Sequence, residues 1–141
     1  MRISDWMKGP VHVVGPREPL RHVRALLVQH RINQLPVVEA GRLVGIIAER
    51  DLRIAFPDLG ELADIGEEHE GVPNPAHVPV ETVMTRDVVV LHPRDTVEEA
   101  ARLMRTRRIS AIPIVEGDHV VGMLTRGDVI DAFLAKASET Q

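Results

Sequence analysis

Two matching stretches decide the fold of this 141-residue chain: Gly45-Ile-Ile-Ala-Glu-Arg-Asp51 and Gly122-Met-Leu-Thr-Arg-Gly-Asp128. Shifting the chain against itself by the 77 residues that separate them aligns residues 4–56 with residues 81–133 without a gap. The chain therefore contains two copies of one unit of about 53 residues. Because a unit of that size buries little surface alone, we expect the two copies to pack face to face.

Each copy predicts the order strand, helix, strand, strand, helix, so the fold class is α/β, with two β-α-β-β-α repeats and small mixed sheets. Pro19 suits a first helical position, and Thr96-Val-Glu-Glu99 is a capping box. Gly117-Asp118 is typical of a tight hairpin. The predicted strands are 11–14, 34–38 and 43–48 in the first copy and 88–91, 111–115 and 120–125 in the second, with closing helices from about residues 50 and 127.

The repeat divides the chain into a first copy at 1–56, a connector at 57–79 and a second copy at 80–141. The connector is rich in Asp, Glu, Gly and Pro, and we expect one helical turn near Leu59–Ile65. Its acidic cluster Glu67-Glu-His-Glu70 favours a solvated linker over a site for a divalent ion. We predict no metal site.

Composition excludes several function classes. With 44% apolar and 27% charged residues the chain is globular, and the lack of cysteine excludes disulfides and thiolate chemistry. The net charge of -4 argues against nucleic acid as a partner. No apolar run approaches a membrane span, so we expect no membrane partner and a cytoplasmic location. Neither a nucleophile elbow nor a Walker loop is present, and we predict that the chain is not an enzyme.

The residues resemble the CBS domain, a family that occurs as tandem pairs. The resemblance is carried by Asp5-Trp-Met7, Thr82-Val-Met-Thr85, Asn33-Gln-Leu-Pro-Val37, Ser110-Ala-Ile-Pro-Ile114 and the two closing stretches. The pair is similar to the CBS region of acetoin-utilisation-type proteins. The resemblance implies a pseudo-two-fold disc whose clefts bind AMP, ADP, ATP or S-adenosylmethionine as regulatory ligands rather than cofactors. It also implies a homodimer and a regulated partner protein.

In the second copy, Asp128 falls in the first turn of a helix, where its carboxylate could accept bonds from a ribose diol. Thr125 is at the N-cap, where its hydroxyl and nearby amides could meet a phosphate, and Arg126 could supply countercharge. A plainer interpretation is that Thr125 and Asp128 only cap the helix. The resemblance implies an adenine slot, aliphatic because aromatics are scarce, at Val88, Ser110, Ala111, Ile112 and Met123.

In the first copy the corresponding slot is Val11, Asn33, Gln34 and Ile46, with Asp51 for the ribose. Ala48 replaces the hydroxyl residue, so this copy is either a second binding site or a degenerate half that supports the fold. His12 falls beside the slot.

Arg102, Arg105 and Arg108 share one helical stripe with Glu98 and Glu99 before it, which favours a salt-bridged solvated face. The alternatives are phosphate contact by Arg107 or Arg108 and, less favoured, a nucleic-acid patch without aromatics for stacking. The leading hypothesis is a sensor that binds an adenosine nucleotide and signals through cleft or dimer geometry. The alternative is a ligand-independent interaction scaffold.

Overall fold

The computed structural model describes residues 1–9, 11–55 and 75–139. The chain forms two compact units: His12–Val88, which we call the central unit, and Met1–Val11 together with Val89–Gln141, which we call the terminal unit. Each unit thus combines most of one copy with the opening segment of the other. The predicted turn at Leu59–Ile65, the cluster Glu67–Glu70 and Phe56 lie outside the described residues.

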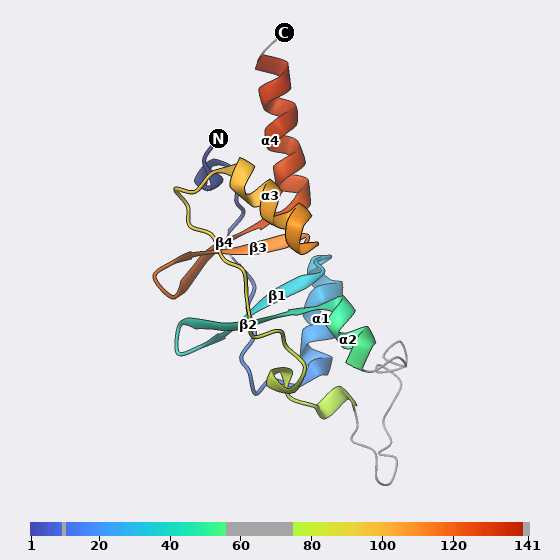
Figure 1. Ribbon diagram of the computed structural model, residues 1–141. Helices are drawn as coiled ribbons and strands as arrows, with labels where there is room; N and C mark the ends of the chain where they lie inside the picture. The colour runs from blue at the N-terminus through green and yellow to red at the C-terminus, as the bar shows by residue number, and fades with distance from the viewer. Residues whose placement is uncertain (10, 56–74, 140–141) are drawn as a thin grey trace. The chain divides into compact units, whose positions relative to one another are not determined.

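The central unit is built on a helix followed by a hairpin (Figure 1). Its elements are α1 (Leu20–His30), β1 (Gln34–Glu39), β2 (Arg42–Ala48) and α2 (Glu49–Ala55), followed by the short helices η3 (Pro75–His77) and η4 (Val80–Thr82). Its core is aliphatic, as the composition predicts, with Leu20, Val23, Leu35, Ile47 and Val80 fully buried. Val80 comes from the opening of the second copy, and its amide donates to the Glu18 carbonyl at 2.9 Å.

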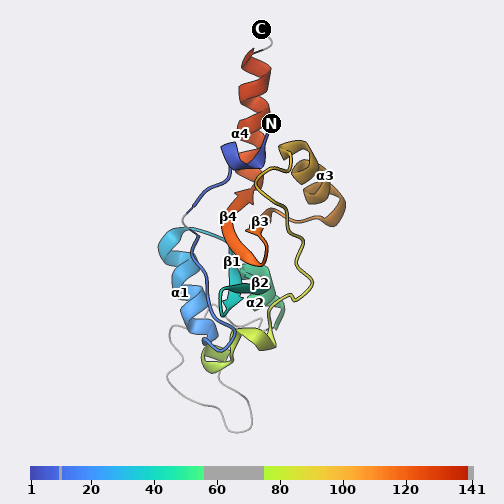
Figure 2. The same cartoon turned by 90° about the vertical axis from the view of Figure 1, so that its left-hand side faces the viewer.

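The terminal unit repeats this arrangement. It contains η1 (Ile3–Asp5), α3 (Val97–Arg107), β3 (Ala111–Glu116), β4 (His119–Thr125) and α4 (Arg126–Glu139). The N-terminal turn lies beside α3 and α4 in both views (Figures 1 and 2), and the Ile3 amide donates to the Asp95 carbonyl at 2.9 Å. Ile3 is fully buried in a cluster with Val97, Ile112 and Leu124, and half-buried Trp6 packs against that cluster.

Each sheet is a two-stranded antiparallel hairpin, β1 with β2 and β3 with β4. The hairpins match the sequence prediction to within one or two residues, including the two-residue turn at Gly117-Asp118. The capping box is confirmed in part, because Thr96 Oγ1 accepts the Glu99 amide at 3.1 Å.

The predicted opening strands 11–14 and 88–91 are wrong as strands, since each is reduced to one parallel bridge, Val14 with Val37 and Leu91 with Ile114. Prolines are the physical cause. The Val14 amide donates to the Pro36 carbonyl, and the Val14 carbonyl accepts a bond from the Val38 amide. The next hydrogen bonds of the ladder, one on each side, would need N–H groups on Pro36 and Pro16, and proline has none. The corresponding prolines in the terminal unit, Pro93 and Pro113, stop the ladder there in the same way.

Two methionines explain the two signature glycines. A Cβ placed on Gly45 would lie 2.6 Å from Met84 Sδ and 3.0 Å from the Thr85 carbonyl oxygen. The same atom on Gly122 would lie 2.7 Å from Met7 Sδ. In each unit, therefore, the segment that comes from the other copy passes directly over the glycine of the hairpin.

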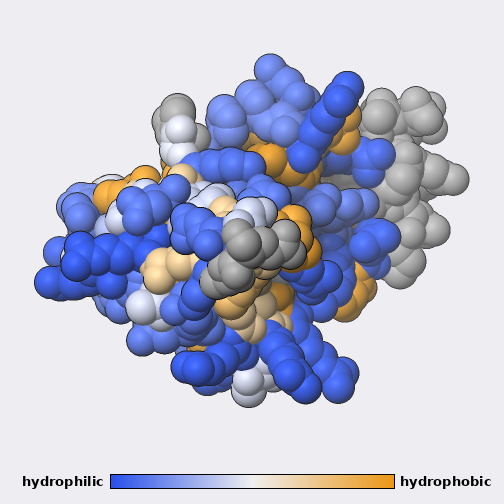
Figure 3. Space-filling view, turned by 90° about the horizontal axis from the view of Figure 1, so that it is seen from above, coloured by the Kyte–Doolittle hydropathy of each residue, from blue (hydrophilic) through white to orange (hydrophobic). Residues whose placement is uncertain are grey.

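On the face shown in Figure 3, most side chains are hydrophilic, and the apolar side chains lie in separate patches. Among the described residues, no helix has the length and apolar character needed to cross a membrane.

Candidate functional site

The first turn of α4 holds Thr125 and Asp128 in a closed capping box. The Thr125 amide and hydroxyl donate to Asp128 Oδ2 at 2.8 and 2.9 Å. In return the Asp128 amide donates to Thr125 Oγ1 at 3.3 Å. These bonds satisfy two donors that a helix N-terminus would otherwise leave free. The plain capping interpretation of the sequence therefore describes the geometry of this turn.

Asp128 has a second partner that the sequence interpretation missed. Lys8 Nζ lies 3.1 Å from Asp128 Oδ1, and the Asp128 side chain is only 2% exposed while that of Lys8 is 77% exposed. Lys8 is held at its backbone, where its amide and carbonyl exchange bonds of 3.1 Å with Met123. The one available signal was the repeat itself, which places Lys8 opposite Thr85 as the residue after the shared methionine.

The buried carboxylate is thus fully engaged: one oxygen closes the helix cap and the other faces a flexible cation. A carboxylate is retained in an apolar environment only when it is paired and hydrogen-bonded. The same two features, an acceptor oxygen at a helix N-terminus and a nearby ammonium, suit a ligand that carries hydroxyl and phosphate groups.

The corresponding turn of the central unit is simpler. Asp51 Oδ2 accepts the Ala48 amide at 2.9 Å, which reproduces half of the box. Ala48 has no hydroxyl to accept the Asp51 amide, and the residue corresponding to Lys8 is Thr85. The two aspartates therefore occupy equivalent places with different surroundings.

The predicted slot residues of the second copy mostly gather around the β3–β4 hairpin. Ala111 pairs with Thr125 across the hairpin, and half-buried Met123 is the strand residue that Lys8 bridges. Ser110 precedes β3, and its carbonyl accepts the Arg126 amide at 2.9 Å. The Ile112 side chain is fully buried and belongs to the hydrophobic core of the terminal unit.

Val88 is the exception, because it falls at the end of the central unit. Conversely Val11, predicted for the first-copy slot, falls in the terminal unit.

The remaining first-copy residues lie together in the central unit. Asn33 is exposed and its carbonyl accepts the Glu49 amide at 3.0 Å, at the start of the same helix turn that holds Asp51. Gln34 pairs with Ala48 across β1 and β2, and Ile46 exchanges two backbone bonds of 2.9 Å with Thr85.

His12 stacks on His30, with ring centroids 3.6 Å apart. The sequence predicted that His12 falls beside the first-copy slot, but it did not predict His30 as its partner.

The candidate phosphate ligands Arg126, Arg107 and Arg108 are all exposed. Arg107 ends α3, and Arg108 follows in the left-handed conformation with φ 56°. The prediction of salt bridges along the arginine stripe is wrong. Among the described residues, Arg102 and Arg105 form no ion pair, and Glu98 Oε1 instead lies 3.6 Å from the Met1 amino group.

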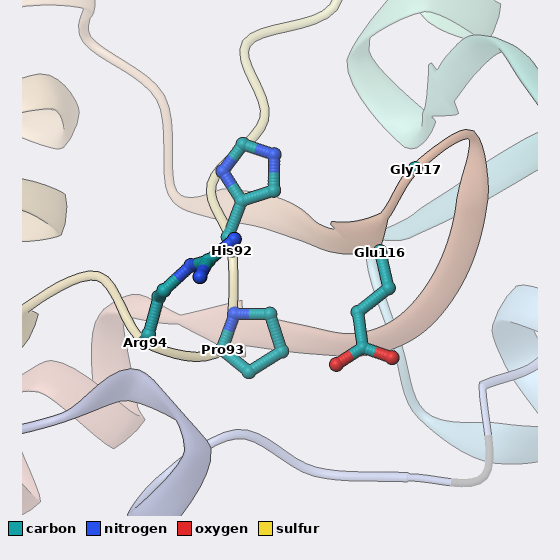
Figure 4. A pocket seen from close by; sticks show the side chains of 5 residues that line it. All are labelled: His92, Pro93, Arg94, Glu116 and Gly117. Atoms are coloured by element: carbon teal, nitrogen blue, oxygen red, sulfur yellow. The ribbon is translucent and has the colours of Figure 1, made fainter.

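A separate pocket of about 380 Å³ opens at the hairpin turn of β3 and β4. Figure 4 shows its lining residues, His92, Pro93, Arg94, Glu116 and Gly117. It contains none of the predicted site residues, because the turn is the opposite end of β4 from Thr125. Within the described parts of the chain, no group of three or more His, Cys, Asp or Glu residues could hold a metal ion.

Two known proteins are similar to this chain over most of their length. "CBS domain-containing protein YhcV" of Bacillus subtilis is 28% identical over 90% of this chain and 81% of its own. The structure of an acetoin utilization protein (AcuB) from Vibrio cholerae has a TM-score of 0.77 at 26% identity, covering 100% of this chain and 97% of that one.

Two other similar structures contain ligands. The CBS domain pair of protein MJ0100, in complex with 5′-methylthioadenosine and S-adenosyl-L-methionine, has a TM-score of 0.76 at 30% identity, covering 96% of this chain and 98% of that one. CBSX2 in complex with AMP has a TM-score of 0.78 at 27% identity, with coverage of 96% and 98%. The family model described as "CBS domain" matches residues 3–58 and 80–135. The chain therefore belongs to the CBS domain family, as a tandem pair.

Proposed function

We propose that the chain is a regulatory module that binds an adenosine nucleotide or a related adenosine ligand at the first turn of α4. The observation that carries the proposal is the buried Asp128, which stands with Thr125 at the signature position of the second copy. The ligands of two similar CBS pairs, AMP in one and 5′-methylthioadenosine with S-adenosyl-L-methionine in the other, support the adenosine class.

The roles follow from the chemistry of each group. Asp128 Oδ1 accepts a ribose hydroxyl, and the N-terminus of α4 with Arg126 stabilises phosphate charge. Ala111, Met123 and the rim residue Ser110 contact adenine, with Val88, Ile112 and the arginines Arg107 and Arg108 as further candidates. Asp51 with Asn33, Gln34 and Ile46 forms a weaker second site, because Ala48 offers no hydroxyl, and Val11 is a further candidate.

The proposed module performs no catalysis. It works as a cytoplasmic homodimer and passes a ligand-dependent change in shape or in dimer geometry to a partner protein.

Binding is tested first by thermal unfolding of the full chain with AMP, ADP, ATP or S-adenosylmethionine. A ligand at 100 times its Kd adds about 2.7 kcal/mol to the free energy of unfolding, which raises the melting temperature by several degrees. If none of the four ligands raises the melting temperature at millimolar concentration, the proposal fails.

Calorimetric titration then locates the site with a matched pair of variants, Asp128→Ala and Asp51→Ala. We expect Asp128→Ala to lose most of the affinity and Asp51→Ala to retain the tighter site. Circular dichroism controls for folding, and Asp128→Asn, which keeps an oxygen for the Thr125 amide, separates ligand loss from cap loss. Unchanged affinity in both Asp128 variants would place the site elsewhere.

A ligand-independent interaction scaffold remains the second candidate, for a specific reason. The Thr125–Asp128 box is complete without a ligand, and α4 exposes Ile130, Phe133 and Leu134 at 51%, 40% and 62%. Sedimentation velocity with and without AMP separates the two functions, since a scaffold keeps the same mass and the same sedimentation coefficient in both conditions, whereas the sensor changes its shape or dimer geometry and therefore its sedimentation coefficient.

A further inference from the structure

Lys8 is the feature that most distinguishes the two copies. It corresponds to Thr85, and both residues exchange a pair of backbone bonds with the middle of a hairpin strand, Lys8 with Met123 and Thr85 with Ile46. Their side chains therefore start from equivalent places. Only the lysine is long enough to reach an aspartate: its ammonium lies 3.1 Å from Asp128, whereas within the described residues no interaction joins the Thr85 side chain to Asp51.

The ion pair occupies the oxygen that a ribose would need. Asp128 Oδ2 already accepts bonds from the amide and the hydroxyl of Thr125. Oδ1 is therefore the remaining acceptor for a ribose hydroxyl, and it is paired with the Lys8 ammonium. With the Asp128 side chain 2% exposed, an incoming hydroxyl competes with the ammonium for Oδ1. The lysine can move, because its side chain is 77% exposed and its four-carbon stem is flexible.

We propose that Lys8 is a specificity residue, a latch that makes this site select adenosine ligands bearing a 5′-phosphate. This inference rests on the proposed function. Every adenosine ligand breaks the Lys8–Asp128 pair on binding. A phosphate gives the released ammonium a new partner and offsets the loss, whereas an uncharged 5′ group leaves the ammonium unpaired.

AMP and 5′-methylthioadenosine are the probes, because they share the adenosine group and differ at the 5′ position. Calorimetric titrations compare the wild-type chain with Lys8→Thr, which installs the residue of the other copy. The matched control is Lys136→Thr, since Lys136 near the end of α4 is the only other lysine.

Removing the latch should tighten binding of 5′-methylthioadenosine about tenfold, the value of one hydrogen bond to a charged group. The AMP affinity should change by less than about threefold, because Lys8→Thr removes both the Lys8–Asp128 pair that opposes binding and the contact from Lys8 to the phosphate that favours it. The preference for AMP thus falls about tenfold in Lys8→Thr and stays constant in Lys136→Thr. An equal change for both ligands in Lys8→Thr, or no change, would overturn the latch.

The test separates the two proposals. If neither probe binds wild type or Lys8→Thr, the latch fails, and the proposed function fails with it when ADP, ATP and S-adenosylmethionine also leave the melting temperature unchanged. If both probes bind wild type and the preference survives in Lys8→Thr, only the latch fails.

A measurement without ligand checks the ion pair itself. Reductive methylation with ¹³C gives two lysine side-chain signals, one for Lys8 and one for Lys136. Asp128→Asn should shift the Lys8 signal and leave that of Lys136, and AMP should shift the Lys8 signal of the wild-type chain. An unmoved Lys8 signal in either experiment contradicts the latch.

Discussion

Substituting alanine for the two signature glycines should destabilise the units unequally. At Gly45 the new Cβ would lie 2.6 Å from Met84 Sδ and 3.0 Å from the Thr85 carbonyl oxygen. The sulfur can shift only within a core where Met84 is 8% exposed, and the oxygen is fixed by the 2.9 Å bond from the Ile46 amide. At Gly122 the corresponding backbone oxygen, that of Lys8, is 3.4 Å away, and half-buried Met7 has more room to move.

Overpacking of this kind costs about 1–3 kcal/mol, against which the reduced freedom of the unfolded chain returns about 0.4–1 kcal/mol. We therefore expect Gly45→Ala to lower the free energy of unfolding by about 1–2 kcal/mol and Gly122→Ala by less than about 1 kcal/mol. Urea unfolding followed by circular dichroism measures both, and the melting temperature of Gly45→Ala should fall by about 2–8 °C.

A double-mutant cycle with Met84→Ala identifies the cause. If the thioether carries part of the clash, Gly45→Ala costs less in the Met84→Ala background, with a coupling energy of at least about 0.5 kcal/mol. The reasoning is refuted if Gly122→Ala is as destabilising as Gly45→Ala, or if Gly45→Ala is neutral.

Substitutions at three further positions test the packing and caps by the same urea assay. Ala48→Thr should complete the half box of Asp51 and raise the free energy of unfolding by about 0.5–1 kcal/mol; no gain would mean that the hydroxyl finds no donor. Thr96→Ala should lower it by about 1 kcal/mol by freeing the Glu99 amide, while Thr96→Ser should be nearly neutral. Ile112→Ala should lower it by about 2–5 kcal/mol because its side chain is fully buried, and a loss below about 1 kcal/mol would contradict that burial.

Local signals predicted most elements because their causes are local. Pro19 before Leu20, Thr96 before Val97 and the turn at Gly117-Asp118 each act within four residues. The turn forms as predicted and Thr96 caps α3 with half of its box, whereas Pro19 is the N-cap of α1 and not its first helical residue. The opening strands failed for a different reason. Whether Val14 extends into a ladder depends on the N–H groups opposite it, and Pro36, 22 residues away, has none.

The candidate site likewise has one part that local sequence signals indicated and one part that only the fold shows. Thr125 and Asp128 were singled out from the sequence because their signature stretch stands at the strand-to-helix junction of a gapless repeat, and the capping box that they form spans only one helical turn. Lys8 was not found, since it lies 120 residues before Asp128 and only the fold brings the two together.

The sequence by itself thus determined the two-fold repeat, the family, the aliphatic core and the turn that carries the signature aspartates, all of which follow from short-range pattern and period. Only the tertiary structure decided that each compact unit takes its opening segment from the other copy. The physical reason is that burial joins residues far apart in the chain: Ile3 fills the core beside Leu124, and Val80 fills the core beside Leu20. That exchange places a lysine on Asp128 in one unit and a threonine at the equivalent backbone position of the other unit, and so makes two similar copies chemically different.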